Sequence, residues 1–301
     1  MELDKKMTLS TLVSLLEPLP SSPLGRQNGV SAAAIDGVSL LRCNQAQGRT
    51  PLMYEPSLIF IAQGQKTGYL ADKTFHYNPG HYLVQTLPLP FECETLASSS
   101  TPLLGVSVSI DPLVLAELVS EMPALLLPDP TPMASVPMSP AMEEAVTRLV
   151  RALHSPADAA VMGRERVREV IYEALKDQQG PALRALVSNQ GNYSRIIKVL
   201  TNLHQRYDNT IRVEDMASEA SMSASAFHKH FKAVTQLAPL QYLKQLRLIK
   251  ARLLLTHDNI NVSQTAVRVG YGSIHQFSRD YKSYFGISPN QDRRSAITAV
   301  A

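Results

Sequence analysis

Two sets of hydrogen-bond-donating side chains lie fifty positions apart in the last third of this 301-residue chain. Within each set the positions follow i, i+3, i+4 and i+7, so on a helix all four side chains share one face. Hydroxyl, imidazole, ammonium and guanidinium groups donate hydrogen bonds to phosphate oxygens and base edges, so contact with a nucleic acid is the chemistry expected of both faces. The sets are Ser225, His228, Lys229 and Lys232, and then His275, Ser278, Arg279 and Lys282.

Aromatic residues occupy another face of the same two segments. Phe277, Tyr281 and Phe285 fall at i, i+4 and i+8, and Phe227 and Phe231 repeat the first two positions fifty residues earlier. Such a stripe packs into a core when the segment is helical. One segment of this kind is compatible with an ordinary surface helix, whereas a duplicate that preserves both faces favours two copies of one binding element.

A tight turn precedes each copy. A short apolar segment ends at Gly270, Ser273 then provides a helix N-cap, and Gly286 is the stop signal. Helix, turn and helix form the helix-turn-helix pattern. The earlier copy has Ala220-Ser221 at its turn, which is tolerated if the turn needs no positive φ. The copies are 49 positions apart before the turn and 50 after it, so the second turn holds one extra residue.

The individual donors differ in what they are expected to contact. Arg279 can hold guanine O6 and N7 through two hydrogen bonds or can contact a phosphate, and the sequence leaves both open. Phosphate contacts are expected for Lys229, Lys232 and Lys282. His230 falls on the apolar side of its segment, so we expect it to be a core histidine.

A long helix is expected to hold the two copies apart. It is predicted over 240–256, after Pro239, and joins the copies. Another helix, over 194–207, is predicted to precede the first copy. At 1.5 Å per residue the joining helix spans roughly 25 Å. That length suits two recognition helices that enter successive turns of one groove face, about 34 Å apart.

The first two thirds of the chain have a different texture. Short apolar runs and turn signals over 30–110, with a hairpin of 66–69 and 74–77, predict a small antiparallel barrel or sandwich that can hold a ligand. Six prolines in 123–140 predict an irregular segment. Helices are expected over 8–17, 113–121, 141–154, 161–178 and 182–187. The helices over 141–154 and 161–178 each carry an apolar stripe, which is either buried in its own domain or forms a dimer seam.

Charge separates the same two parts of the chain. From Ser194 onward, 15 Lys and Arg stand against 7 Asp and Glu, and residues 1–193 hold 14 against 19. A basic module on an acidic body is typical of a nucleic-acid-binding domain joined to another domain. Neither an apolar run of about 20 residues nor a signal peptide is found. We therefore expect a cytoplasmic protein without a membrane partner.

Side chains that could bind a metal or catalyse a reaction are poorly placed. His76, His81, Glu92 and Cys93 lack the His-x-His spacing, with a later Glu and His, of a metal-binding cupin. Cys43 and Cys93 form neither a disulfide framework nor a zinc pattern. Because catalytic triads, phosphate loops and dinucleotide fingerprints are also missing, we expect no metal, no cofactor and no catalytic residues.

The second half of the basic module carries a family signature. Its residues are Tyr242-Leu243, Arg247-Leu248, Ala251-Arg252, Leu254-Leu255, Ala266, Gly270-Tyr271, Ser273, Phe277-Ser278-Arg279, Tyr281-Lys282, Phe285-Gly286 and Ser288-Pro289. This pattern resembles that of AraC/XylS-type transcription regulators. More loosely, residues 30–120 resemble the cupin-like N-terminal domain of one AraC subgroup. The latter likeness is carried by Tyr54-Glu55-Pro56-Ser57, Gln63-Gly64, Pro79-Gly80 and Asp111-Pro112.

The resemblance implies an α+β chain, in which a cupin-like β-barrel with flanking helices precedes an all-α domain of seven helices and two helix-turn-helix units. Residues 1–190 would form the effector-sensing or dimerisation domain, with the barrel about 30–110 and helices about 111–187. Residues 191–294 would bind DNA, and 295–301 would be a tail. The positions carried over as DNA contacts are Ser225, His228 and Lys229, and then Ile274, His275, Ser278 and Arg279.

The function expected from these features is that of a bacterial DNA-binding transcription regulator, an activator rather than an enzyme. Its expected partners are promoter double-stranded DNA, RNA polymerase, an unidentified small-molecule effector and a second copy of the chain. Two alternatives remain at this level. One is a metal-dependent cupin-type enzyme fused to a DNA-binding module, and the other is a ligand-independent regulator whose first domain only dimerises.

Overall fold

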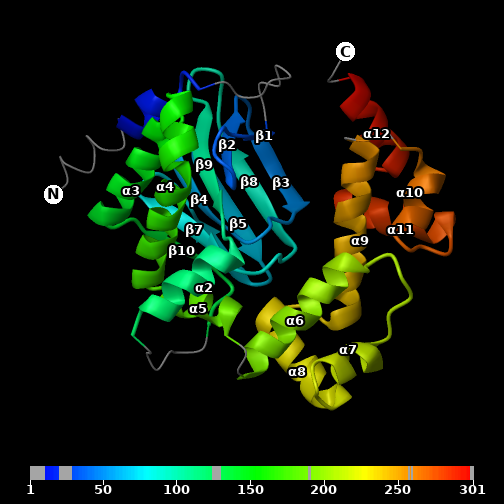
Figure 1. The fold of residues 1–301 in the computed structure, drawn as a ribbon. Helices are drawn as coiled ribbons and strands as arrows, with labels where there is room; N and C mark the ends of the chain where they lie inside the picture. Colours follow the sequence, from blue (N-terminus) through cyan, green and yellow to red (C-terminus); the bar gives the residue numbers. More distant parts are fainter. Residues whose placement is uncertain are drawn as a thin grey trace. The chain divides into compact units, whose positions relative to one another are not determined.

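A computed structural model describes residues 11–19, 29–123, 130–188, 191–256, 258 and 260–298 of the chain (Figure 1). The chain divides into two compact units, one built mainly from residues before 190 and the other mainly from residues 190 onward. None of the described helices is both long and apolar enough to cross a membrane.

The first unit contains two sheets, as the run of short apolar segments predicts. Among the described residues, one sheet orders six strands as β1-β2-β9-β4-β7-β10, and the other orders four as β3-β8-β5-β6. Neither β1 nor β3 was expected, because their residues are mostly exposed and lack an apolar pattern. The strands are β1 Gly29–Ala32, β2 Val38–Cys43, β3 Gln47–Leu52, β4 Ser57–Gln63, β5 Gln65–Leu70, β6 Lys73–His76, β7 His81–Gln85, β8 Phe91–Leu96, β9 Leu103–Ser109 and β10 Met133–Pro137.

The predicted hairpin is confirmed as the antiparallel pair β5 and β6. Leu70 lies opposite Lys73, and Ala71 at the turn has a φ of 53°. On its other side β5 pairs with β8, where Gly68 lies opposite Cys93. Because side chains alternate along a strand, Lys66 shares the face of Gly68 and Cys93, and all three are buried.

Strand β10 corrects the expectation that 123–140 lacks regular structure. It pairs antiparallel with β7, so that Met133 lies opposite Gln85 and Pro137 opposite His81. Proline is tolerated there because β10 is the edge of the six-stranded sheet and one side of its backbone needs no partner. Residues 124–129 of the same segment lie outside the described residues.

Three helices of the first unit begin in the same way. Asp111, Ser139 and Ser155 each cap a helix by accepting a hydrogen bond from a backbone N–H of its first turn, and proline follows within two positions. The cap at Ser155 starts α4 five residues before the expected 161. Residues 11–16 are also helical, while 8–10 of that expected helix lie outside the described residues. The helices are α2 Pro112–Glu121, α3 Pro140–Ala152, α4 Pro156–Lys176 and α5 Gly180–Val187.

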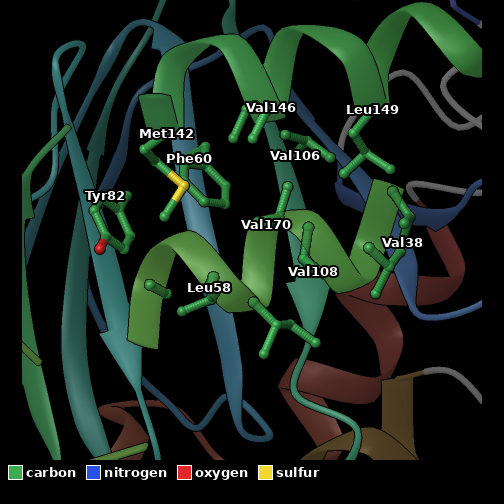
Figure 2. Close-up of a cluster of buried hydrophobic side chains, with 14 of the residues drawn as sticks. Val38, Leu58, Phe60, Tyr82, Val106, Val108, Met142, Val146, Leu149 and Val170 are labelled. Carbon is green, nitrogen blue, oxygen red and sulfur yellow. The ribbon is translucent and has the colours of Figure 1, made fainter. Parts of the chain in front are cut away.

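The main core lies between the six-stranded sheet and helices α3 and α4 (Figure 2). Val146 and Leu149 of α3 and Val170 of α4 are fully buried against sheet residues such as Phe60 and Val106. Burial of each such side chain stabilises the fold by about 1.5–3 kcal/mol. The dimer-seam hypothesis for these two stripes is therefore wrong, because the stripes are covered within their own unit.

The second unit is helical throughout its regular structure. In the described part of the chain it has the seven helices that the family resemblance implies, with α6–α8 at one end of the long helix α9 and α10–α12 at the other (Figure 1). The last helix continues to Thr298, so residues 295–298 of the expected tail are helical. The helices are α6 Gly191–Gln205, α7 Val213–Glu219, α8 Ala224–Thr235, α9 Pro239–Thr256, α10 Val262–Arg268, α11 Ile274–Phe285 and α12 Pro289–Thr298.

Candidate nucleic-acid interface

Helix α8 presents the first set of donors. The Ser223 side chain caps it by accepting a hydrogen bond from the Ala226 N–H at 3.3 Å. Phe227 and Phe231 are fully buried and fix which face turns inward. The outward face carries the four predicted donors, all of them exposed, namely Ser225, His228, Lys229 and Lys232.

Helix α11 repeats this arrangement at the other end of the unit. Ser273 caps it by accepting from the Gln276 N–H at 3.4 Å, and Phe277 and Tyr281 are fully buried. Of the five residues predicted to face a ligand, four are exposed and Ser278 is half-buried. The exposed four are Ile274, His275, Arg279 and Lys282.

The cations on these two faces have no ion-pair or hydrogen-bond partner among the described residues. The side chains of Lys229, Lys232, Arg279 and Lys282 make no hydrogen bond or ion pair with any described residue. Inward-facing cations of the same unit behave differently: Arg252, for example, pairs with Asp292 at 2.9 Å. The outward donors are therefore available to an anionic partner.

His230 differs from its expected position. It is half-buried rather than part of the core, and its Nε2 atom lies 3.2 Å from the side-chain amide of Asn192. The apolar side of α8 ends at the two phenylalanines, and His230 lies at the margin of that side.

The two turns begin with the same backbone conformation but have different residues. Ser221 has a φ of 52° and Gly270 a φ of 80°, and in each turn the next residue donates its N–H to an alanine of the preceding helix at 2.9 Å. From the sequence, Ala220-Ser221 is expected to be tolerated only if this turn needs no positive φ. Because Ser221 has a positive φ, that condition is not met and the backbone at Ser221 is strained. The extra residue of the second turn is Gly272, which separates Tyr271 from the cap.

Arg247 on α9 holds the loop between α6 and α7. Its Nε atom donates to the Tyr207 carbonyl at 2.7 Å and an Nη atom donates to the Asn209 carbonyl at 2.8 Å. Burial lowers the pKa of this guanidinium below its usual value. The sequence marks Arg247 only as part of the family signature, and nothing in its spacing predicts this role.

A buried carboxylate joins three helices of the second unit. Asp292 of α12 accepts a hydrogen bond from the Tyr281 hydroxyl at 2.7 Å and pairs with Arg252 of α9. These contacts fix α11 against α9 and α12. Burial, followed by the hydrogen bond to Asp292, raises the pKa of Tyr281 well above its usual value. Sequence reasoning missed Asp292, because no local pattern separates it from an ordinary acidic residue of a first helical turn.

A half-buried histidine makes the stability of this unit depend on pH. The Nε2 atom of His204 on α6 lies 2.7 Å from the Tyr242 hydroxyl of α9, and burial, followed by the charge of Lys250, lowers the pKa of His204 from 6.5 to about 4. The folded state therefore favours the neutral ring. Its contribution is complete above pH 6.5 and is lost as pH falls toward 4. We expect the free energy of unfolding to drop by about 3 kcal/mol across that interval.

Urea denaturation of the wild type and of His204→Gln at several pH values measures this effect. Glutamine can still accept the Tyr242 hydrogen bond but does not titrate. The stability difference between the two proteins should shrink as pH falls from 6.5 toward 4. Two parallel curves would rule out His204 as the source of the pH dependence.

No group of three or more His, Cys, Asp and Glu side chains able to hold a metal occurs among the described residues. His76, for example, contacts Thr67, and Glu92 pairs with Arg49. Three of the four residues weighed in the sequence as metal ligands, His76, Glu92 and Cys93, thus have separate side-chain partners.

Comparison with protein families gives two matches that together span most of the chain. Residues 34–182 match the model of the AraC-type transcriptional regulator N-terminus, and residues 216–295 match a helix-turn-helix domain. The first match covers strands β2 to β10 and helices α2 to α4. The second begins in α7 and ends in α12, so it contains α8 and α11.

Curated relatives resemble the second unit. The Msm operon regulatory protein of Streptococcus mutans is 29% identical over 107 residues, which are 36% of this chain and 38% of that protein. The transcriptional activator RhaS of Citrobacter koseri is 35% identical over 103 residues, 34% of this chain and 37% of that protein. The chain thus spans less than two fifths of the length of these relatives.

Solved structures resemble the whole fold. An apo structure of a ToxT variant from Vibrio cholerae has a TM-score of 0.59 at 9% identity and covers 89% of this chain and 99% of that one. Wild-type ToxT with a bound unsaturated fatty acid has a TM-score of 0.60 at 9% identity, covering 85% and 94%. At this identity the likeness concerns the fold alone.

Proposed function

We infer that this chain, which belongs to the AraC-type family of transcriptional regulators, binds promoter DNA through α8 and α11 and thereby regulates transcription. One observation carries the inference. Two capped helices with buried aromatic faces present matching exposed donors, and the cations among those donors have no partner in the described part of the protein.

The proposed mode of binding follows from the spacing of the two recognition helices. Helix α9 has 18 residues, which corresponds to about 27 Å of helix. It allows α8 and α11 to enter successive major-groove segments of one face of the duplex, about 34 Å apart. Lys229, Lys232 and Lys282 contact phosphates, which fixes the register, and Arg279 contacts either a guanine or a phosphate.

Salt dependence tests this proposal. Sites would first be selected from fragments of genomic DNA, and binding of the full chain would then be followed by fluorescence anisotropy. If the four outward cations neutralise phosphates, affinity should fall roughly a hundredfold between about 50 and 200 mM salt, because each contact releases a counterion. An affinity that does not change over this range would contradict phosphate-driven binding by these helices.

The first unit is proposed to bind a small-molecule effector and to contribute to a homodimer, with RNA polymerase as a further partner in the cytoplasm. Support for an effector comes from the ToxT structure with a bound unsaturated fatty acid, whose fold this chain shares. A thermal-shift screen of the full chain against small carboxylic acids and sugars addresses it. A specific ligand at a hundred times its Kd should stabilise the protein by about 2.7 kcal/mol.

A further inference from the structure

A closed ring of four polar side chains lies inside the first unit, beside the four-stranded sheet. The Lys66 ammonium donates to the Tyr54 hydroxyl at 3.2 Å and to the Cys93 sulfur at 3.6 Å. The Tyr77 hydroxyl lies 3.1 Å from that sulfur and 3.5 Å from the Tyr54 hydroxyl. Lys66, Tyr77 and Cys93 are 8%, 0% and 4% exposed. We call these four residues the Lys66–Cys93 cluster.

The sheet holds the amine and the thiol together. Cys93 of β8 lies opposite Gly68 of β5, and Lys66 is two residues before Gly68, so both side chains project from the same face of neighbouring strands. The backbone around Lys66 is also fixed, because its N–H donates to the Asn78 side chain at 3.0 Å and its carbonyl accepts from the Tyr77 N–H at 3.2 Å. The short distance between Nζ and Sγ is thus a property of the strand register.

The electrostatics of this pair are unusual for a buried lysine. Glu92 and Glu94 flank Cys93, but they project from the opposite face, where they bind Arg49 and Tyr69. Among the described residues, no carboxylate contacts the Lys66 ammonium, whose side-chain partners are a phenol and a thiol. A buried cation is costly without an anion, and the thiolate is the form in which a cysteine sulfur acts as a nucleophile.

We propose that Lys66 and Cys93 are a redox modification site, at which a hydroperoxide drives formation of a covalent S–N bond between the two side chains. In the first step the Cys93 thiolate attacks a peroxide oxygen and the O–O bond breaks. The departing hydroxide takes a proton from the Lys66 ammonium and leaves as water. The products are a Cys93 sulfenic acid and a neutral Lys66 amine.

The second step uses the amine that the first step has released. The Nζ lone pair attacks the sulfur, the S–O bond breaks, and the oxygen leaves as a second water with one proton from the sulfenic acid and one from the amine. Sulfur is oxidised by two electrons overall, and the peroxide is reduced to water. Sulfenic acids are known to condense with nitrogen in this way, and the Tyr77 hydroxyl holds the sulfur toward Nζ.

The second cysteine of the chain provides an internal control. Cys43 is also buried, but its sulfur contacts the Gln45 carbonyl at 3.0 Å, and no cation is found against it in the described residues. We therefore expect Cys43 to stay reduced under conditions that modify Cys93.

Mass spectrometry of the full chain tests the proposal directly. The reduced protein would be treated with a small excess of hydrogen peroxide, quenched, and digested without reductant. The expected product joins the peptide of Lys66 to the peptide of Cys93, is two hydrogen atoms lighter than their sum, and separates on treatment with dithiothreitol. The same product is expected from Cys43→Ser. In Lys66→Arg the cation remains but cannot form the bond, so dimedone should trap a Cys93 sulfenic acid.

Four outcomes in the wild type would overturn the proposal, even if a variant fails to fold. They are a Cys93 that stays reduced, a Cys93 oxidised without a link to Lys66, a disulfide with Cys43, and a linked pair that retains an oxygen atom between nitrogen and sulfur. The crosslink is independent of DNA binding, so its failure would leave the proposed regulator intact.

Discussion

Replacing Lys229 and Arg279 together with alanine is expected to lower the affinity for operator DNA by about two orders of magnitude, with no change in melting temperature. Both side chains are exposed and unpaired within the described residues, so their loss costs no internal contact. A hydrogen-bonded contact with the DNA at residue 229 or at residue 279 is worth about 1–3 kcal/mol. The two effects should add, because the residues lie on separate helices and share no partner. Anisotropy titrations at one fixed salt concentration measure the change.

The substitution Arg279→Lys separates the two interpretations of Arg279. If the guanidinium reads guanine bidentately, lysine should lose discrimination among operator sequences, whereas a phosphate contact should survive. Lys198→Ala is the matched control for the alanine variant of Lys229 and Arg279, since Lys198 is an exposed cation on α6 outside both helix-turn-helix units. Unchanged operator occupancy by the folded double variant would refute the assignment of α8 and α11 as recognition helices.

Gly270→Ala is expected to destabilise the second helix-turn-helix unit by about 2–5 kcal/mol. Gly270 has a φ of 80°, and an alanine Cβ at this position would lie 2.4 Å from the Asp208 carbonyl oxygen. The left-handed conformation costs an alanine about 1–2 kcal/mol, and the overlap with backbone adds a further cost of about 1–3 kcal/mol. Urea denaturation monitored by circular dichroism measures the loss, and DNA affinity should fall with it.

The equivalent turn of the first helix-turn-helix, between α7 and α8, supplies the opposite substitution. Ser221 has a φ of 52°, so Ser221→Gly should relieve strain and raise the free energy of unfolding by up to about 1 kcal/mol. The two variants change one residue at matching positions of duplicated turns, and they should change stability with opposite signs. A Gly270→Ala protein as stable as the wild type would show that the turn can relax away from the 206–210 loop.

How far local sequence predicted the structure depended on the range of the interactions. The bounds of α11 were predicted correctly, because Ser273 and Gly286 act within one turn of the helix ends that they cap. The hairpin of β5 and β6 was predicted for the same reason, through the turn at 71–72. Strand β10 was missed, because its stability comes from pairing with β7, about fifty residues away in sequence.

The candidate interface was the most predictable part of the chain. Helical periodicity alone places the aromatics on one face of α8 and α11 and the donors on another, and the structure has both faces as predicted. The contacts that hold these helices were not predictable. Arg247 binds carbonyls forty and thirty-eight residues away, and Asp292 joins α9 to α11, so neither leaves a local pattern.

By itself, the amino-acid sequence determined that most of the helices exist, where α11 starts and stops, and which side chains face outward on α8 and α11, because each of these depends on neighbours within a few positions. Only the tertiary structure decided that the stripes of α3 and α4 are core, that Ser221 adopts a left-handed backbone, and that Lys66 meets Cys93. Those outcomes depend on strand register and on contacts between distant segments, and such contacts exist only once the chain has folded.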